Sequence, residues 1–216
     1  MKNIYTLQNA SKTIWRRALL VLFWGLFLGG VIGQTVPRKL LIFSARRASF
    51  KPISLAGHGF VSWATQPTAR SGVAAKTTLG LFPTDGQALP GLIINGLPAE
   101  VVSGFRENSH RVPTFRAIFE LEPESWKAAL DTAKNWHGRR YFLLTRNCVS
   151  FMDGVAEAAG MDTPSMYFLW IFPRHPVRWL KLLAKRNTEQ QVEINTPVRF
   201  EFGEVEPQTY SIDKKE

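Results

Sequence analysis

Cys148, the only cysteine in the 216-residue chain, follows an asparagine at the expected start of a helix. A thiol becomes a good nucleophile when it ionises. The unpaired N–H groups and partial positive charge of a helix N-terminus favour that ionisation. The same N–H groups can hold the oxyanion that forms when a carbonyl is attacked. Cys148 is therefore a candidate nucleophile, and the alternative is a small apolar side chain packed in the core.

A nucleophilic cysteine needs a base within reach, and the chain has four histidines. His58 lies in a predicted strand between two glycines, which allow another element to approach the ring closely. His137 lies at a predicted helix end, His175 lies between prolines in a basic segment, and His110 lies in a polar loop. Local context favours His58 as the base.

The sequence indicates neither a metal site nor a cofactor. A single cysteine excludes a disulfide within one chain and a cysteine-based zinc site. The histidines lack the spacing of a His-only metal site.

The net charge of +10 is concentrated in the N-terminal part of the chain. Eleven Lys and Arg, and no Asp or Glu, precede Asp85, whereas the remainder has 16 basic and 17 acidic residues. This distribution is typical of a membrane flank, and nucleic-acid binding is not expected because it would rest on net charge alone.

Residues 18–36 are 19 consecutive uncharged residues with arginine or lysine on both sides. A helix of this length crosses a hydrocarbon core of about 30 Å, so a transmembrane anchor is expected. A cleaved signal peptide and a buried core helix are the alternatives, although the long run and its basic flanks favour the anchor. We expect the domain to be exported, on the periplasmic side in a Gram-negative cell, or secreted if the segment is cleaved.

The folded part begins with predicted strands. Residues 53–65 and 73–83 read as two strands joined by the turn 66–72, and residues 92–98 offer a further short strand. Residues 113–122 alternate so that Arg116 and Glu120 share one face. The apolar residues expected on the other face are Phe115, Ala117, Phe119 and Leu121.

Helices are predicted next. Pro123 opens a helix whose apolar face is Trp126, Ala129, Leu130 and Ala133. A second helix begins at Cys148, capped by Thr145 or Asn147. Residues 166–186 hold an uncharged aromatic run followed by five basic residues. This segment either lies at a lipid headgroup surface or packs Trp179, Leu180 and Leu183 on the domain. The last residues, including 197–202, read as one or two strands.

The pattern Tyr141-x-Leu143-x-x-x-Asn147-Cys148-x-x-Phe151 resembles the active-site helix of the circularly permuted NlpC/P60 superfamily. Its best-known branch is the lecithin:retinol acyltransferase-like group. In that superfamily a papain-like core is permuted, so that the histidine strand precedes the cysteine helix. Here "GHGFVSW" precedes "NCVSF" by about ninety residues, and the resemblance covers roughly residues 55–164.

The resemblance implies that Cys148 is the nucleophile and His58 its base. The family orients the histidine with a third polar residue, for which Thr78 and His110 are the candidates. Tyr141 would line the site or donate a hydrogen bond, and Asn147 would cap the helix. The acyltransferase branch often carries a Glu-His pair at positions 149 and 150, which are Val and Ser here. The lipid acyltransferase label is therefore not transferred.

We therefore expect an α+β fold: a permuted papain-like NlpC/P60 core whose antiparallel sheet packs against the cysteine helix, preceded by a transmembrane helix. The expected divisions are an anchor or signal segment (1–37), a basic linker (38–52), the NlpC/P60-like domain (53–165) and an aromatic and basic extension (166–216).

The expected function is a membrane-tethered thiol hydrolase or acyl transferase that acts on an amide, ester or thioester carbonyl. Its substrate would be peptidoglycan peptide or acyl lipid. Membrane lipid would be contacted through residues 18–36 and, in one interpretation, 166–186. The alternative is a non-catalytic membrane-associated binding module that kept the papain-like fold.

Overall fold

The computed structural model describes residues 36–47, 57–68, 70–84, 96–109, 113–168, 172–196, 198–200 and 205–206. Residues Pro37–Glu216 form one compact unit. Apart from Val36, the expected anchor segment lies outside the described residues. Within the described ranges, no helix is long and apolar enough to cross a bilayer.

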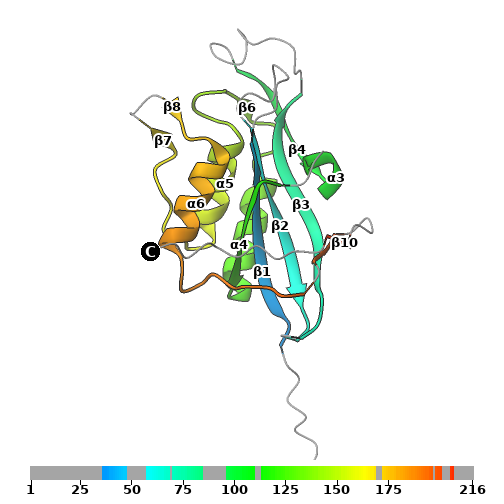
Figure 1. Ribbon diagram of the computed structural model, residues 1–216. Helices are drawn as coiled ribbons and strands as arrows, with labels where there is room; N and C mark the ends of the chain where they lie inside the picture. The colour runs from blue at the N-terminus through cyan, green and yellow to red at the C-terminus, as the bar shows by residue number, and fades with distance from the viewer. Residues whose placement is uncertain are drawn as a thin grey trace, which may run out of the picture. The chain divides into compact units, whose positions relative to one another are not determined.

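The fold is α+β and is built on one large, mainly antiparallel sheet (Figure 1). Four long strands pair side by side in the order β3-β2-β1-β5. Their bounds are β1 Arg38–Arg46, β2 His58–Gln66, β3 Val73–Pro83 and β5 Phe115–Leu121. The far edge of β3 is shared between two strands: β9 (Val198–Phe200) lies parallel to its first residues, and β4 (Leu97–Ser103) lies antiparallel to its last.

Shorter strands complete the described part of the sheet. β6 (Arg140–Tyr141) pairs with β4, and β10 (Val205–Glu206) pairs with β9. A separate two-stranded ribbon consists of β7 (Tyr167–Phe168) and β8 (Phe172–Pro173). The pairing of Leu97 with Tyr141 fixes the position of Tyr141 just before the cysteine helix.

The described residues contain four helices: α3 Phe105–Ser109, α4 Pro123–Lys134, α5 Cys148–Ala158 and α6 Pro176–Arg186. Side chains of α4, α5 and α6 join the larger core cluster on one face of the sheet, which we call the α5 face. The short helix α3 and strand β9 contribute to the smaller cluster on the opposite face, the α3 face. Figure 1 shows α5 and α6 beside each other, with α3 on the other side of the sheet.

Strand β1 is central and apolar on both faces. Leu41 and Phe43 belong to the core of the α5 face, and Leu40 and Ile42 belong to that of the α3 face. A strand covered on both faces reads as a continuous apolar run, without the alternation that marks a half-exposed strand. The prediction of a basic linker at residues 38–52 is therefore wrong for Arg38–Arg46. These residues form a strand that is basic only at its ends.

Several sequence predictions are confirmed. The hairpin predicted at residues 53–65 and 73–83 is confirmed by the antiparallel pairing of β2 with β3, although residues 53–56 lie outside the described residues. Strand β5 turns its predicted apolar residues to the α5 face. Arg116 lies on the opposite face as expected, but it is only 4% exposed because it packs over the rings of Phe105 and Phe200. Helices α4 and α5 begin where they were predicted.

The expected boundary at residue 165 is wrong, because the following segment belongs to the same compact unit. Helix α6 packs Trp179, Leu180 and Leu183 into the α5-face core, which confirms the packing alternative for this helix. Strand β9 is part of the main sheet, as its pairing with β3 shows.

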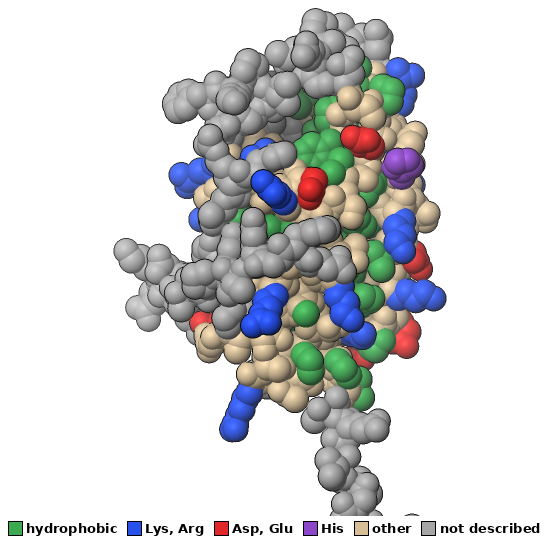
Figure 2. Space-filling model, turned by 90° about the vertical axis from the view of Figure 1, so that its right-hand side faces the viewer, with side chains coloured by type: hydrophobic (Ala, Val, Ile, Leu, Met, Phe, Trp, Pro, Cys, Tyr) green, Lys and Arg blue, Asp and Glu red, His purple; other side chains and the backbone are tan. Residues whose placement is uncertain are grey.

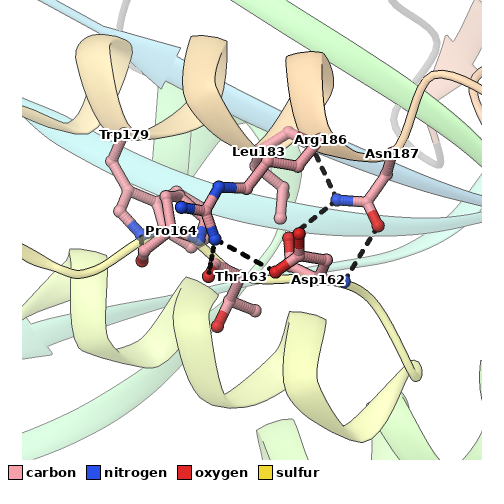
Figure 3. A network of polar contacts seen from close by, with 7 residues as sticks. All are labelled: Asp162, Thr163, Pro164, Trp179, Leu183, Arg186 and Asn187. Carbon is pink, nitrogen blue, oxygen red and sulfur yellow. Dashed lines mark hydrogen bonds and ion pairs between the residues drawn. The ribbon is translucent and has the colours of Figure 1, made fainter.

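A polar network fastens the end of α6 to the segment that follows α5 (Figure 3). The Asn187 amide donates to the carbonyls of Asp162 and Leu183, and its oxygen accepts from the Asp162 N–H, each at 2.9 Å. The Trp179 indole donates to the Pro164 carbonyl at 3.2 Å. Arg186 adds a more exposed ion pair with Asp162. The network sets the position of α6 relative to α5.

Replacing Asn187 with Ala should lower the free energy of unfolding by about 1–3 kcal/mol, because it leaves buried backbone groups without partners. Urea denaturation of both proteins would measure the difference. Arg186→Ala is the matched control, since an exposed ion pair contributes at most about 1 kcal/mol. Equal small losses in the two variants would show that Asn187 does not hold α6 in place.

Candidate active site

Asn147 caps helix α5 and thereby orients Cys148. The Asn147 side-chain oxygen accepts hydrogen bonds from the N–H groups of Val149 (2.8 Å) and Ser150 (3.2 Å). In return, the Ser150 hydroxyl accepts from the Asn147 N–H at 2.7 Å. This reciprocal capping box satisfies orphan donors of the first helical turn. The capping role predicted for Asn147 is confirmed.

Groups that favour a thiolate surround the sulfur of Cys148. The backbone N–H groups of Gly59, Cys148 and Val149 and the positive charge of Arg46 are close enough to the thiol to act on its pKa. Each of these lowers the pKa of the thiol, but burial has the larger effect and raises that pKa above its ordinary value. The side chain is 4% exposed. The closed site therefore holds a neutral thiol beside donors that would suit an anion.

Tyr141 lies directly beside Cys148, as the resemblance implied. Its phenol interacts with both the Cys148 thiol and the Cys148 backbone N–H. Burial first, and the neighbouring Cys148 second, raise the pKa of Tyr141 well above its ordinary value. The phenol therefore stays neutral and keeps its proton as a hydrogen-bond donor.

His58 does not meet Cys148, because its side chain lies on the α3 face of the sheet. Its ring packs against Phe82, with centroids 4.2 Å apart, and against Phe60, with centroids 5.9 Å apart. Successive side chains of a strand point to opposite faces, so the next residue, Gly59, faces α5. A Cβ on Gly59 would meet Met152 of α5. The expected thiol–imidazole pair of Cys148 and His58 is therefore not formed.

Of the two candidates for the third polar residue, Thr78 lies away from the thiol and His110 lies outside the described residues. Thr78 is buried and shares a 2.8 Å hydrogen bond between its hydroxyl and that of Ser62, which joins β3 to β2. It lies on the α3 face with Gly80 and Phe82, two and four residues further along β3. His110 lies outside the described residues.

His175, which the sequence reasoning passed over, is on the face that carries the thiol. It caps α6, with Nδ1 accepting from the Val177 N–H at 3.3 Å. Its Nε2 lies 2.9 Å from the point where a Cβ on Gly57 would sit. Burial, and secondly the charge of Arg47, lower the pKa of His175, which favours the neutral ring. The His-Pro pair at the start of a basic, apolar-striped segment was the available signal for a helix cap.

Gly57 and Gly59 create the space in which α5 and α6 meet strand β2. A Cβ on Gly59 would contact Met152 and lie 3.5 Å from Pro176, and a Cβ on Gly57 would meet His175. The Cys148 thiol near Gly59 and the His175 ring near Gly57 therefore lie beside residues that are two apart in the sequence.

Among the described residues, no group of three or more His, Cys, Asp or Glu side chains is arranged to hold a metal ion. Comparison of the chain with protein-family models, with curated proteins and with solved structures found no match.

Gly57→Ala should destabilise the protein more than Gly138→Ala does. Both glycines have a positive φ, 72° and 77°, so each substitution carries the cost of a left-handed alanine, about 1–2 kcal/mol. At Gly57 the new Cβ would also lie 2.6 Å from the Arg46 carbonyl oxygen, whereas at Gly138 it meets nothing. This overpacking should add about 1–3 kcal/mol in urea unfolding. Equal losses would mean that the Gly57 site is not closely packed.

Asp153 on α5 makes stability depend on pH. Burial, and secondly the neighbouring Glu157, raise the pKa of Asp153 to about 6, against a hydrogen bond with Thr163 that lowers it. In the unfolded chain its pKa is about 3.9. Between these values the folded state binds the extra proton, so this group makes the free energy of unfolding fall as pH rises from about 4 to 6.

Asp153→Asn should remove that contribution. The variant should therefore gain stability relative to the parent protein as pH rises from 4 to 7, as urea unfolding at several pH values would show. A stability difference that stays constant across this range would contradict the raised pKa. Glu189→Gln is a suitable control, because Glu189 is exposed on the turn after α6.

Proposed function

We propose that the chain is a thiol-dependent hydrolase or acyltransferase with a permuted papain-like core, in which Cys148 is the nucleophile. The observation that carries this proposal is the set of donors around one sulfur. These are N–H groups from both β2 and α5, the Tyr141 phenol, and the charge of Arg46. A small apolar core residue has no need of such surroundings.

The same donors fit the chemistry of acyl transfer. A Cys148 thiolate attacks the carbonyl carbon of an amide, ester or thioester, and the carbonyl oxygen becomes an oxyanion. Because Asn147 already accepts from the Val149 and Ser150 N–H groups, the Cys148 N–H and the Tyr141 hydroxyl are the donors that we assign to that oxyanion. Collapse of the tetrahedral intermediate expels the leaving group and leaves an acyl thioester on Cys148.

His175 is the imidazole that we assign to this reaction in place of His58. It takes the thiol proton at Nε2 and gives that proton to the departing amine, alcohol or thiol. Water or another acceptor then attacks the thioester, and the same ring removes its proton. A neutral ring with a free Nε2 carries its proton on Nδ1. Proton uptake therefore requires the ring to give up the 3.3 Å bond from the Val177 N–H.

The substrate class follows from the sequence-based expectation of a membrane anchor. A domain tethered by residues 18–36 and exported would act on peptide of the cell wall close to the membrane, or on an acyl lipid. Because Cys148 is 4% exposed, a carbonyl reaches the sulfur only after the surrounding chain opens. We therefore expect the enzyme to be active only after its substrate has displaced the residues that cover the sulfur.

The second candidate is a membrane-associated binding module without catalysis. Two observations favour this alternative. Burial raises the pKa of Cys148, and His58 lies on the other face of the sheet from the thiol. The two candidates differ in the reactivity of one thiol, which can be measured directly because the chain has a single cysteine.

The pH dependence of Cys148 alkylation by iodoacetamide, and of its acylation, tests the proposal in the full-length protein. Because burial raises the pKa of the closed thiol, iodoacetamide alone should react only above the pH of about 8.5 at which free cysteine ionises. Acylation by an activated thioester, which opens the site, should instead rise well below that pH. His175→Asn, which keeps a helix-capping side chain but cannot titrate, should shift that profile upward and abolish hydrolysis of an activated thioester. His58→Asn is the matched control and should leave both readouts unchanged.

The outcomes separate the alternatives. An acylation profile with its midpoint at or above the pH at which free cysteine ionises, with no hydrolysis, would establish the non-catalytic module. Loss of reactivity in His58→Asn but not in His175→Asn would restore the imidazole that the resemblance implies. Cys148→Ser must lose all labelling, because no other thiol is present.

A further inference from the structure

The thiol of Cys148 and the thioether of Met152 both lie beside Gly59 of β2. Cys148 and Met152 are four residues apart on α5, so they share one side of the helix. The Gly59 N–H acts on the pKa of the thiol, and Met152 Sδ lies 2.6 Å from the point where a Cβ on Gly59 would sit. The end of Met152 therefore fills the space over Gly59, beside the candidate nucleophile.

This space is apolar and closed. Among the described residues, the side chains nearest to the Cβ point of Gly59 are those of Met152 and Pro176, and neither is charged. Cys148 is 4% exposed and Met152 is fully buried, and both belong to the core of the α5 face. A substrate therefore reaches the sulfur by displacing a side chain of this core.

Met152 is the side chain in this space that can move at the lowest cost. It is unbranched and turns about several bonds, so it adopts many conformations without a change in the backbone. Pro176, in contrast, is a ring that is fixed at the start of α6. Rotation of Met152 alone would uncover Gly59 and leave α5 and its cap in place.

The surface of the described residues offers little to hold an apolar group of a substrate. Val36 is the one large hydrophobic side chain among them that is exposed. On the face drawn in Figure 2, basic, acidic and hydrophobic side chains lie interspersed. An apolar group would therefore be held in the interior, and the space over Gly59 is the part of the interior beside the thiol.

We propose that Met152 is the movable cover of Cys148, and that the space its thioether vacates receives a short apolar acyl chain of the substrate. The inference rests on the proposed function, because it takes Cys148 to be the acceptor of an acyl group. Burial of the acyl chain removes apolar surface from water and so favours the open position of Met152. Met152 thereby limits the length of the acyl chain that fits.

Mixed-disulfide formation tests the cover without requiring catalysis. The full-length protein is treated with n-butyl methanethiosulfonate or its charged sulfonatoethyl counterpart, and each labelling rate is divided by that of glutathione. The Cys148 thiolate displaces methanesulfinate and forms a disulfide. Met152→Ala should label about ten-fold faster with the butyl reagent, since a covered thiol reacts in the roughly one-tenth or less of molecules that are open. The butyl reagent should also outpace the charged one.

Two further variants make the labelling result decisive. Met161→Ala is the matched control and should label as the parent protein does, because Met161 is buried in the same core beyond the other end of α5. Met152→Val keeps more of the core volume, so it guards against misfolding of the alanine variant, and it should also label faster. Equal butyl rates in the parent protein and the Met152 variants would overturn the proposal, as would equal rates with the two reagents.

A series of acyl thioesters, from acetyl to octanoyl, tests the space for the acyl chain. The longest chain that acylates Cys148 should be longer in Met152→Ala by roughly three atoms, the number that the substitution removes. An unchanged limit would overturn the assignment of this space. If no thioester acylates any of the proteins, the proposed function fails and the acyl chain has no site here. Faster labelling of the Met152 variants would still support Met152 as the cover.

Discussion

The arrangement depends on the missing side chains at Gly57 and Gly59. Gly59, in β2, leaves room for Met152 of α5 and Pro176 of α6, and Gly57, just before β2, leaves room for His175. A Cβ on Gly59 would require the end of the Met152 side chain to move. Because the Gly59 amide is close enough to the thiol to act on its pKa, the same close approach gives Cys148 a donor from outside its own helix.

Strand geometry divides the residues around these glycines between two environments. Side chains alternate along β2, so His58 joins Phe60 on the α3 face while Gly59 and Val61 belong to the α5 face. A shift of one residue in the strand would exchange the two faces and bring His58 toward the thiol. The register of β2 against β1, in which Arg38 pairs with Gln66 and Arg46 pairs with His58, fixes which face His58 occupies.

The sequence predicted well the parts in which one face is buried and the other is not. Strand β5 alternates, and α5 has a capping asparagine before an apolar stripe, so both could be located. The prediction from sequence failed for strands that are covered on both faces of the sheet. In β1 and β2 apolar residues are consecutive, as in Phe60 and Val61, so no pattern reveals which face His58 occupies. The position of His175 beside Gly57 depends on the tertiary approach of α6, which is not a local property of the sequence.

The competition between burial and hydrogen bonding at Cys148 links ionisation to opening of the site. The donors belong to the backbone of β2 and α5 and, with Tyr141, to the rigid part of the core. Burial, in contrast, depends on whatever covers the sulfur, and it outweighs the donors in the closed state. Removing the cover would eliminate the term that raises the pKa and retain the terms that lower it. If Cys148 is the nucleophile that we propose, a substrate that opens the site would generate the thiolate that attacks it.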